Sequence, residues 1–344
     1  MAADQAAELI DAVRSAAADG RRLTLVGAGS KAPAADPGDA LAVAENAGVV
    51  DYRPEELVLT ARGGTPLSDI EAMLSQHRQQ LPFEPPMIGG AGTLGGAVAT
   101  GWSGPGRPWR GAVRDAVLGV EMINGLGERL AFGGQVMKNV AGYDLSRLQA
   151  GAWGSLGILL SISVRLSPQP ERERTCRLEC GATDALAWMR KWARRFSPIS
   201  ATCFDGGVLN VRLSGMADSV DAAASRIGGE QSPDLSLWQA LRDRALPVFR
   251  SAGQGSATLW QINCAPAAEL PAGPCLVEWG GARRWWRTDE PPSAVCAYAA
   301  ESGGIALPAG AAPSFQTPLM IRLKQAFDPE SLFSFHLVDA DALQ

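Results

Sequence analysis

The 344-residue sequence is poor in the residues that build metal and nucleic-acid sites. It has only two histidines, His77 and His336, and they are not paired at the spacing of a metal-ligand motif. Its six cysteines include no Cys-x-x-Cys pair, which argues against an iron–sulfur cluster held by this chain. The net charge of −5 provides no basic field for nucleic acid. We therefore expect neither a metal centre nor a nucleic-acid interface.

Long apolar runs are also missing. No stretch of about 18 uninterrupted apolar residues is present, so the sequence predicts no membrane-spanning helix. The first residues include the acidic Asp4 and Glu8 and lack the basic start and the apolar region of a signal peptide, so we expect none. Cys176 and Cys180 fall on one face of a predicted strand, an ordinary core pattern that favours free thiols in a reducing compartment. These features predict a cytoplasmic protein.

Glycine, by contrast, is concentrated in one region. Ten of the 39 glycines lie between residues 89 and 119: Gly89, Gly90, Gly92, Gly95, Gly96, Gly101, Gly104, Gly106, Gly111 and Gly119. Hydroxyl residues such as Thr93 and Ser103 alternate with them. Small residues let backbone N–H groups converge on an anion, so this region predicts a diphosphate-binding nest. The alternative is a flexible linker, but the interleaved apolar residues suit a buried core.

A second glycine cluster, Gly27-Ala28-Gly29-Ser30-Lys31, follows a predicted strand at 22–26. It lacks the spacing of a Walker A loop and of a dinucleotide-binding fingerprint. Taken alone, this turn is either a phosphate contact or a plain strand–turn connection. The two glycine clusters together favour the first alternative.

Several segments carry a resemblance to a known family. The two glycine clusters, with LTARGGTPLSDIEAML at 59–74 between them, resemble the FAD-binding domain of the vanillyl-alcohol oxidase (PCMH) type. More closely, PFEPP at 82–86, GRPWRGAVRDAVLG at 106–119, FGGQVMKNVAGYDLSRL at 132–148 and VEWGGARRWWR at 277–287 resemble the FAD-binding subunit of bacterial glycolate oxidase, a glycolate dehydrogenase.

The resemblance implies a set of FAD-binding residues. Gly27, Gly29, Ser30 and Lys31 would hold the diphosphate, and Thr93, Leu94, Gly95, Gly96, Ser103 and Gly104 would line the diphosphate and flavin side. Asp115 and Val117 would lie near the ribityl or adenosine part, and Gly154, Gly157 and Ile158 near the adenine. Tyr143 either packs beneath the flavin or is a core tyrosine.

The sequence divides at two prolines, Pro168 and Pro170. We expect an α+β fold with a two-part PCMH-type FAD-binding domain at 1–168 and a C-terminal α+β, FAD-linked-oxidase-like domain at 171–344. In the first, periodicity predicts helices at 5–18 and 66–76, the second capped by Thr65, and strands at 22–26, 57–61 and 113–122.

In the second domain, the order strand, helix, strand, strand, helix over 174–227 predicts a ferredoxin-like layer. A hairpin is expected around 280–281. Trp279, Trp285 and Trp286 lie there among three arginines, a pattern that fits core packing, a partner interface or contact with a nucleotide.

The predicted function is that of a non-covalent FAD-binding subunit of a multi-subunit glycolate dehydrogenase, which converts glycolate to glyoxylate. Neither His nor Cys, the usual covalent anchors, occurs in 27–31 or 89–119. By resemblance, the partners would be a homologous flavoprotein subunit and an iron–sulfur subunit, with peripheral attachment to the inner membrane through the complex.

Two other functions stay open: a self-contained FAD oxidoreductase for another hydroxy acid or alcohol, and a non-catalytic assembly module without FAD. The residues identify no catalytic base. The resemblance further implies that the C-terminal segment reaches back to the flavin, although Ser334-Phe335-His336-Leu337 replaces the family's usual ending.

Overall fold

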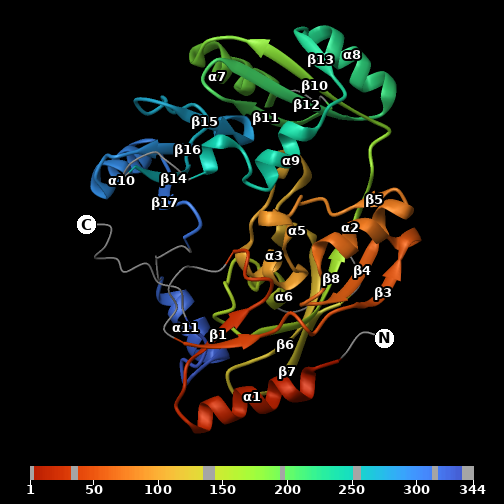
Figure 1. Cartoon of the computed structure of the whole chain (residues 1–344), viewed down its shortest axis with the longest axis vertical. Coiled ribbons are helices and arrows are strands. Elements are labelled where there is room, and N and C mark those ends of the chain that lie inside the picture. Colours follow the sequence, from red (N-terminus) through yellow and green to blue (C-terminus); the bar gives the residue numbers. More distant parts are fainter. Residues whose placement is uncertain are drawn as a thin grey trace. The chain divides into compact units, whose positions relative to one another are not determined.

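The computed structural model describes residues 4–31, 38–134, 144–193, 198–250, 257–311 and 317–334. The chain forms two compact units, drawn in Figure 1. Within the described ranges, the first unit holds 4–103, 111–169 and 317–334, and the second holds 104–110 and 170–311. The main division falls between Gln169 and Pro170, next to the prolines that mark it in the sequence.

The first unit is built on a five-stranded antiparallel sheet with the order β3-β4-β8-β6-β7. Its strands are β3 (Val49–Arg53), β4 (Val58–Arg62), β6 (Val117–Ile123), β7 (Arg129–Gly133) and β8 (Ile158–Arg165). A parallel pair joins β1 (Leu23–Val26) to β2 (Asp39–Ala42), and an antiparallel pair joins β5 (Gln79–Gln80) to β9 (Ser167–Pro168).

The helices of the first unit cover this framework. They are α1 (Ala6–Ala18), α2 (Leu67–Gln76), α3 (Leu94–Thr100), α5 (Val113–Ala116), α6 (Leu145–Leu148) and α11 (Pro318–Phe327), with 3-10 turns at Pro54–Glu56 and Ile88–Gly90. Helices α2 and α3 bury Leu67, Ile70 and Leu94 against the five-stranded sheet, and α1 buries Leu9 and Val13 beside β1. Two separate cores therefore support β1 and α3.

The structure confirms most predicted elements of this unit and corrects two details. Thr65 does not cap α2, because its hydroxyl bonds to Gly48 and Arg62 instead. The strand expected at 113–122 begins only at Val117, because residues 113–116 form the helical turn α5. A carboxylate that bonds to a nearby backbone N–H favours such a turn over a strand.

The second unit contains an eight-stranded antiparallel sheet with the order β13-β10-β12-β11-β15-β16-β14-β17. Its strands are β10 (Arg172–Glu179), β11 (Ile199–Phe204), β12 (Val208–Gly215), β13 (Glu230–Ser232), β14 (Thr258–Asn263), β15 (Cys275–Glu278), β16 (Arg283–Thr288) and β17 (Ile305–Pro308). The helices are α4 (Arg107–Arg110), α7 (Ala182–Ala193), α8 (Ala217–Ile227), α9 (Ser236–Arg242) and α10 (Pro292–Glu301), with 3-10 turns at Pro247–Phe249 and Trp279–Gly281.

The first half of this sheet confirms the ferredoxin-like prediction. Across the sheet these four strands lie in the order β13-β10-β12-β11, which is fourth, first, third, second when they are numbered along the chain, and α7 and α8 are the connecting helices. The hairpin predicted around 280–281 is also present, as β15 and β16. The strands β14–β17 extend the layer to eight strands.

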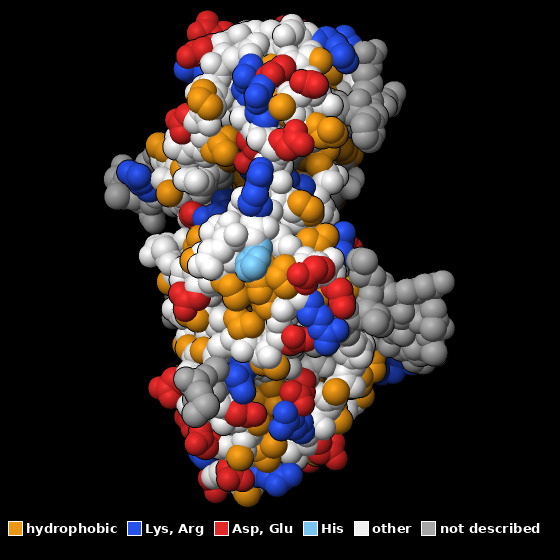
Figure 2. Space-filling view, turned by 90° about the vertical axis from the view of Figure 1, so that its right-hand side faces the viewer, with side chains coloured by type: hydrophobic (Ala, Val, Ile, Leu, Met, Phe, Trp, Pro, Cys, Tyr) orange, Lys and Arg blue, Asp and Glu red, His pale blue; other side chains and the backbone are white. Residues whose placement is uncertain are grey.

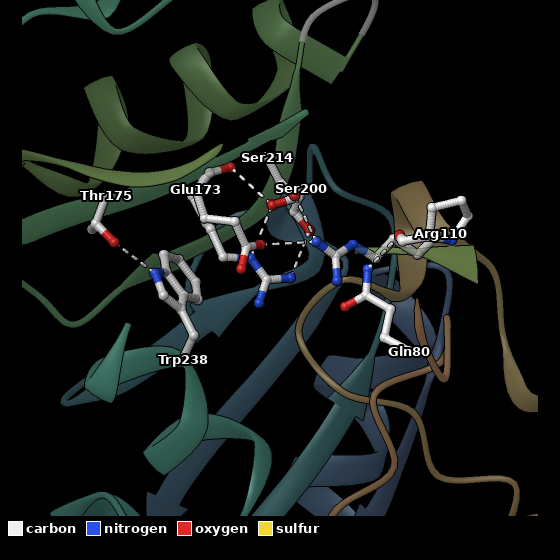
Figure 3. A network of polar contacts seen from close by, with 9 residues as sticks. Gln80, Arg110, Glu173, Thr175, Ser200, Ser214 and Trp238 are labelled. Carbon is white, nitrogen blue, oxygen red and sulfur yellow. Dashed lines mark hydrogen bonds and ion pairs between the residues drawn. The ribbon is translucent and has the colours of Figure 1, made fainter. Parts of the chain in front are cut away.

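Hydrogen bonds between polar side chains link segments of the second unit, as Figure 3 shows. The indole of Trp238 donates to the Thr175 hydroxyl at 2.9 Å. Arg110 donates to Glu173 at 3.0 Å and to the Ser214 hydroxyl at 2.7 Å. These bonds, together with packing of Trp109 on the core, explain why residues 104–110 belong to the second unit although they lie inside the expected first domain.

The surface shows no single-sign field on the face drawn in Figure 2, where acidic and basic side chains are interspersed. Within the described ranges, no helix is both long and apolar enough to cross a membrane. In the same ranges, no group of three or more His, Cys, Asp or Glu side chains is placed to hold a metal ion.

Candidate functional site

The turn after β1 presents unused backbone donors. Among the described residues, none accepts a hydrogen bond from the N–H groups of Ala28, Gly29 or Ser30. Gly29 has a φ of 70°, and a Cβ built there would meet no atom within 4 Å. Consecutive N–H groups around a left-handed residue form a concave anion-binding arrangement. This turn therefore has open donors of the kind that an anion requires.

The structure brings the two glycine clusters together. A Cβ added to Gly27 would lie 3.0 Å from the hydroxyl oxygen of Thr93, the residue before α3. The Nζ atom of Lys31 lies 3.3 Å from the position of a Cβ at Gly92. Residues separated by more than 60 positions in the sequence thus share one site in the first unit.

The start of α3 uses its own donors internally. The N–H of Leu94 donates to Thr65, that of Gly95 to Gly63 at 2.7 Å, and that of Gly96 to the Thr93 hydroxyl at 3.1 Å. A Cβ at Gly95 would lie 2.8 Å from the Gly63 carbonyl oxygen. The glycine at 95 is therefore required by a close approach of two backbone segments, and Leu94 is a buried core residue.

Four further candidates from the sequence serve the local structure. The Ser103 hydroxyl accepts from the N–H of Val113 at 3.2 Å, and Asp115 accepts from the N–H of Ala112 at 2.8 Å. Val117 is fully buried in the core at the start of β6. Gly104 belongs to the second unit, where its carbonyl accepts from the Trp279 indole at 3.0 Å. Each of these four residues therefore has a structural role, whether or not it also contacts a cofactor.

The segment at 154–158 lies beside β1. Gly154 has a φ of 77°, and a Cβ there would lie 3.2 Å from a methyl carbon of Leu25. A Cβ at Gly157 would clash with the Ile123 carbonyl, so this glycine lets β8 start against β6. Ile158 is buried in the core that β1 shares with α1. These residues flank the strand that leads into the open turn.

Tyr143, with Lys138 and Gly142, lies outside the described residues. A nearby residue that sequence reasoning missed is Gln149, whose side chain is 2% exposed. Its Nε2 atom finds no acceptor within the described ranges. A buried amide donor without a partner is costly, and its place in FGGQVMKNVAGYDLSRLQAG beside the expected flavin region was the only signal for it.

A buried ion pair near the C-terminus was also missed. Lys324 of α11 donates to the Asp328 carboxylate and to the carbonyl oxygens of Ser155 and Phe333, both at 2.7 Å. Asp328 is fully buried and Lys324 is 8% exposed. Burial lowers the pKa of Lys324 despite the opposing effect of the Asp328 carboxylate. The four-residue spacing on a helix was the available signal.

In the second unit, the Trp- and Arg-rich hairpin is mainly core. Arg283 donates to Glu278 at 2.7 Å, and its guanidinium lies 3.5 Å from the centre of the Trp279 ring. Trp285 and Trp286 are buried in cores on the two faces of the sheet. Of the three readings of this hairpin, core packing is the one that these contacts support.

Unused hydrogen-bond donors in the first unit suit an anionic group. The unused N–H groups of 28–30 suit a diphosphate, and the buried Nε2 of Gln149 offers one more donor to a polar ring system. The described residues supply no histidine near these donors, because His77 ends α2 and packs edge-on against Tyr52. His336 lies outside the described residues.

Comparisons with known proteins show the family of this chain. A family described as "FAD binding domain" matches residues 1–133. The chain is 41% identical over 343 residues to the glycolate oxidase subunit GlcE of Escherichia coli K12, with 96% of each chain covered.

More distant relatives match only part of the chain. The glycolate oxidase subunit GlcD of Bacillus subtilis is 32% identical over 37% of this chain and 27% of its own length. A D-2-hydroxyglutarate dehydrogenase of Xanthomonas citri is 30% identical over 40% of this chain and 29% of its own length. Among solved structures, an alkyldihydroxyacetonephosphate synthase aligns over 95% of this chain and 74% of its own, with a TM-score of 0.68 and 14% identity. That likeness concerns the fold.

Proposed function

Because this chain belongs to the family of the glycolate oxidase subunit GlcE, we propose that it is the FAD-binding subunit of a multi-subunit glycolate oxidase. The complex oxidises glycolate to glyoxylate and passes the electrons to an acceptor through its partner subunits. The single observation that carries the proposal is the open turn after β1, three unused N–H groups beside the start of α3, in a family whose relatives oxidise hydroxy acids.

Bound FAD would supply the two-electron acceptor that no amino-acid side chain provides. The residues of this chain would bind and orient it. The N–H groups of Ala28, Gly29 and Ser30 would hold the diphosphate, with the Lys31 ammonium adding positive charge. The glycines at 92, 95 and 96 would let the start of α3 pack closely on its neighbouring segments beside the cofactor. Gly154, Gly157 and Ile158 would support the adenine side.

The remaining residues of the expected site have subordinate roles in this proposal. Thr93 and Ser103, whose hydroxyls accept hydrogen bonds from nearby backbone N–H groups, would also contact the cofactor through these hydroxyls. Asp115 and Val117 would act indirectly, by fixing the positions of α5 and β6. Leu94 would act only through its backbone. Gly104 and Tyr143 stay predictions carried by the resemblance. The FAD is non-covalent, since neither His nor Cys occurs in 27–31 or 89–119.

Partners follow from what this chain does not provide. Its cysteines are buried or partly buried residues of the second unit, without the close sequence spacing that cluster ligands usually have. We propose that an iron–sulfur subunit carries the electrons onward and that a homologous flavoprotein subunit meets glycolate. The complex would lie in the cytoplasm, attached peripherally to the inner membrane. A self-contained FAD oxidoreductase and a non-catalytic module without FAD are the alternatives to be separated.

The experiment compares dye reduction by glycolate in two preparations, the isolated FAD-loaded chain and the assembled complex. We expect the complex to turn over and the isolated chain to be slower by about 10²–10⁴, the usual contribution of a positioned base. In a self-contained enzyme, Tyr143, Lys138 or an arginine would have to supply the chemistry. Equal turnover by the isolated chain that is lost in Lys138→Ala or Tyr143→Phe would favour that enzyme. An isolated chain without flavin, which also fails to take up added FAD, would favour the assembly module.

A further inference from the structure

Strand β1, which leads into the open turn, has little support of its own. It is four residues long, and its only partner among the named strands is β2. A two-stranded pairing of this length is marginal in water, so other contacts must fix the strand. The position of the turn at 27–31 depends on those contacts, because the turn is the direct continuation of β1.

The second edge of β1 is occupied by the C-terminal segment, defined here as residues 317–334. The N–H of Leu23 donates to the Leu332 carbonyl at 2.7 Å, and the N–H of Ser334 donates to the Leu23 carbonyl at 2.9 Å. Phe333 pairs with Leu23 in parallel register, and the hydroxyls of Thr24 and Ser334 lie 3.3 Å apart. Figure 1 shows α11 in blue beside the red β1. Residues 332–334 thus act as a third strand.

The Lys324–Asp328 pair holds this third strand in place. Asp328 accepts from the N–H of Leu332 at 2.9 Å and from that of Phe333 at 2.8 Å, while Lys324 donates to the Phe333 carbonyl. A Cβ at Gly125 would clash with the Asp328 carboxylate, and the Gly125 N–H donates to the Phe327 carbonyl at 2.9 Å. The turn after β6 therefore closes over the pair.

The Lys324 ammonium also bonds to the 154–158 segment. Its third hydrogen bond goes to the Ser155 carbonyl, between Gly154, which touches Leu25 of β1, and Gly157, which starts β8. One buried side chain therefore joins the strand next to β1 and the 154–158 segment. All three of its donors are used, as the burial of an ammonium group requires.

We propose that Lys324 and Asp328 are positioning residues for the cofactor: they fix the C-terminal segment along β1 and so hold the 27–31 turn and the 154–158 segment in the arrangement that binds FAD. This inference rests on the proposed FAD binding. It assigns the C-terminal segment an indirect role, through the strand that it pairs with. When the pair is broken, only a fraction of molecules has the binding-competent turn, and the apparent affinity falls by that fraction.

The test measures the dissociation constant of FAD for the full-length apoprotein by quenching of flavin fluorescence, in wild type, Lys324→Met and Asp328→Asn. Lys191→Met is the matched control, because Lys191 is an exposed lysine on α7 of the second unit. Hydrogen exchange of the amides of 23–26 is measured on the same samples, with those of 208–213 in the second unit as internal reference.

We expect the dissociation constant to rise about tenfold or more in Lys324→Met and Asp328→Asn, with faster exchange at 23–26 and unchanged exchange at 208–213. Lys191→Met should match wild type in both readouts. If Lys324→Met unfolds the second unit too, Asp328→Asn decides, because its remaining carbonyl oxygen still accepts one of the backbone N–H groups.

Wild-type affinity in Asp328→Asn, or unchanged exchange at 23–26, would overturn the inference. Failure of the proposed function looks different. In that case wild type itself does not bind FAD, and the exchange comparison still decides whether the pair fixes β1.

Discussion

Among the described residues, both compact units contain a buried ion pair, Lys324–Asp328 in the first and Arg283–Glu278 in the second, and the two pairs differ in how many of their polar atoms are hydrogen-bonded. In the first unit, Asp328 accepts three hydrogen bonds over both oxygens, and Lys324 uses all its donors. In the second, Glu278 accepts from Arg283 and from the Trp285 indole through one oxygen only. Its second oxygen is buried and has no donor within the described residues.

The difference separates two roles for a buried charge. An ion pair whose donors and acceptors are all used, and which also bonds to the backbone of distant segments, fixes the arrangement of those segments. Lys324 is such a case, because it donates to Ser155, Asp328 and Phe333. The incomplete pair in the second unit instead lies within one hairpin, since Glu278 and Arg283 face each other across β15 and β16. Replacement of the carboxylate of the pair by an amide should therefore lower the free energy of unfolding more in the first unit than in the second.

The largest effect is expected where the comparison is tested directly, by Asp328→Asn against Glu278→Gln. The new amide at 328 must replace an oxygen that accepts a backbone or ammonium donor, so the first unit should lose about 3–5 kcal/mol, the usual cost of breaking a buried pair. Glu278→Gln also removes the counter-charge of Arg283, but the amide can take the place of the unpartnered oxygen and leave both hydrogen bonds intact, so its cost should lie at the lower end of that range, about 3 kcal/mol. Urea unfolding with hydrogen exchange resolved by unit measures both. A greater loss from Glu278→Gln would contradict this ranking.

The second prediction compares two kinds of glycine in the first unit, one that close backbone packing requires and one that faces no protein atom and is proposed to face the ligand. Gly95→Val should lower the stability of the first unit and abolish FAD binding together, because the side chain collides with the Gly63 backbone. A Cβ at Gly29 meets no atom within 4 Å, so Gly29→Val should cost only about 1–3 kcal/mol of backbone strain while still preventing FAD binding.

The control for both glycine variants is Cys176→Ala, a core change in the second unit, which should leave the FAD stoichiometry unchanged. Thermal unfolding and flavin content give the two readouts. Full FAD content in Gly29→Val would show that the turn at 27–31 does not hold the cofactor.

The smallest effect concerns pH. All six cysteines lie in the second unit, and burial raises the pKa of Cys275 to about 12 from the ordinary 9.0. The folded form therefore keeps its proton where the unfolded chain loses it, and stability is lost as the pH rises from about 9 towards 12. Between pH 9 and 10 this thiol should account for about 1 kcal/mol.

Cys275→Ala should flatten that loss, measured by urea unfolding of the second unit at pH 8, 9 and 10. The first unit, which has no cysteine, should show no change on this substitution. An identical pH slope in wild type and Cys275→Ala would show that Cys275 titrates normally.

Local patterns predicted much of this fold. The helix at 5–18, the strand at 22–26, the order of elements over 174–227 and the hairpin at 280–281 all follow from periodicity and turn residues. The start of β6 was missed because Asp115 bonds to the Ala112 N–H and forms a helical turn, a choice that apolar spacing does not reveal.

The site was harder to foresee because its groups meet through long-range contacts. The sequence indicated both glycine clusters, but only the structure shows that the N–H groups of 94–96 are used internally while those of 28–30 are open. The Lys324 contacts to 155 and 333 depend on tertiary packing, and so does the shift of 104–110 to the second unit. Which FAD contacts Tyr143 makes stays a prediction from the resemblance.

The most direct test of the central claim is the flavin content of the purified chain before and after acid precipitation. We expect about one FAD per chain, released into the supernatant, because backbone donors and glycine turns hold it without a covalent bond. A colourless chain that takes up no added FAD would contradict the claim that the 27–31 turn binds a cofactor. Yellow colour retained in the washed pellet would contradict the non-covalent mode of binding.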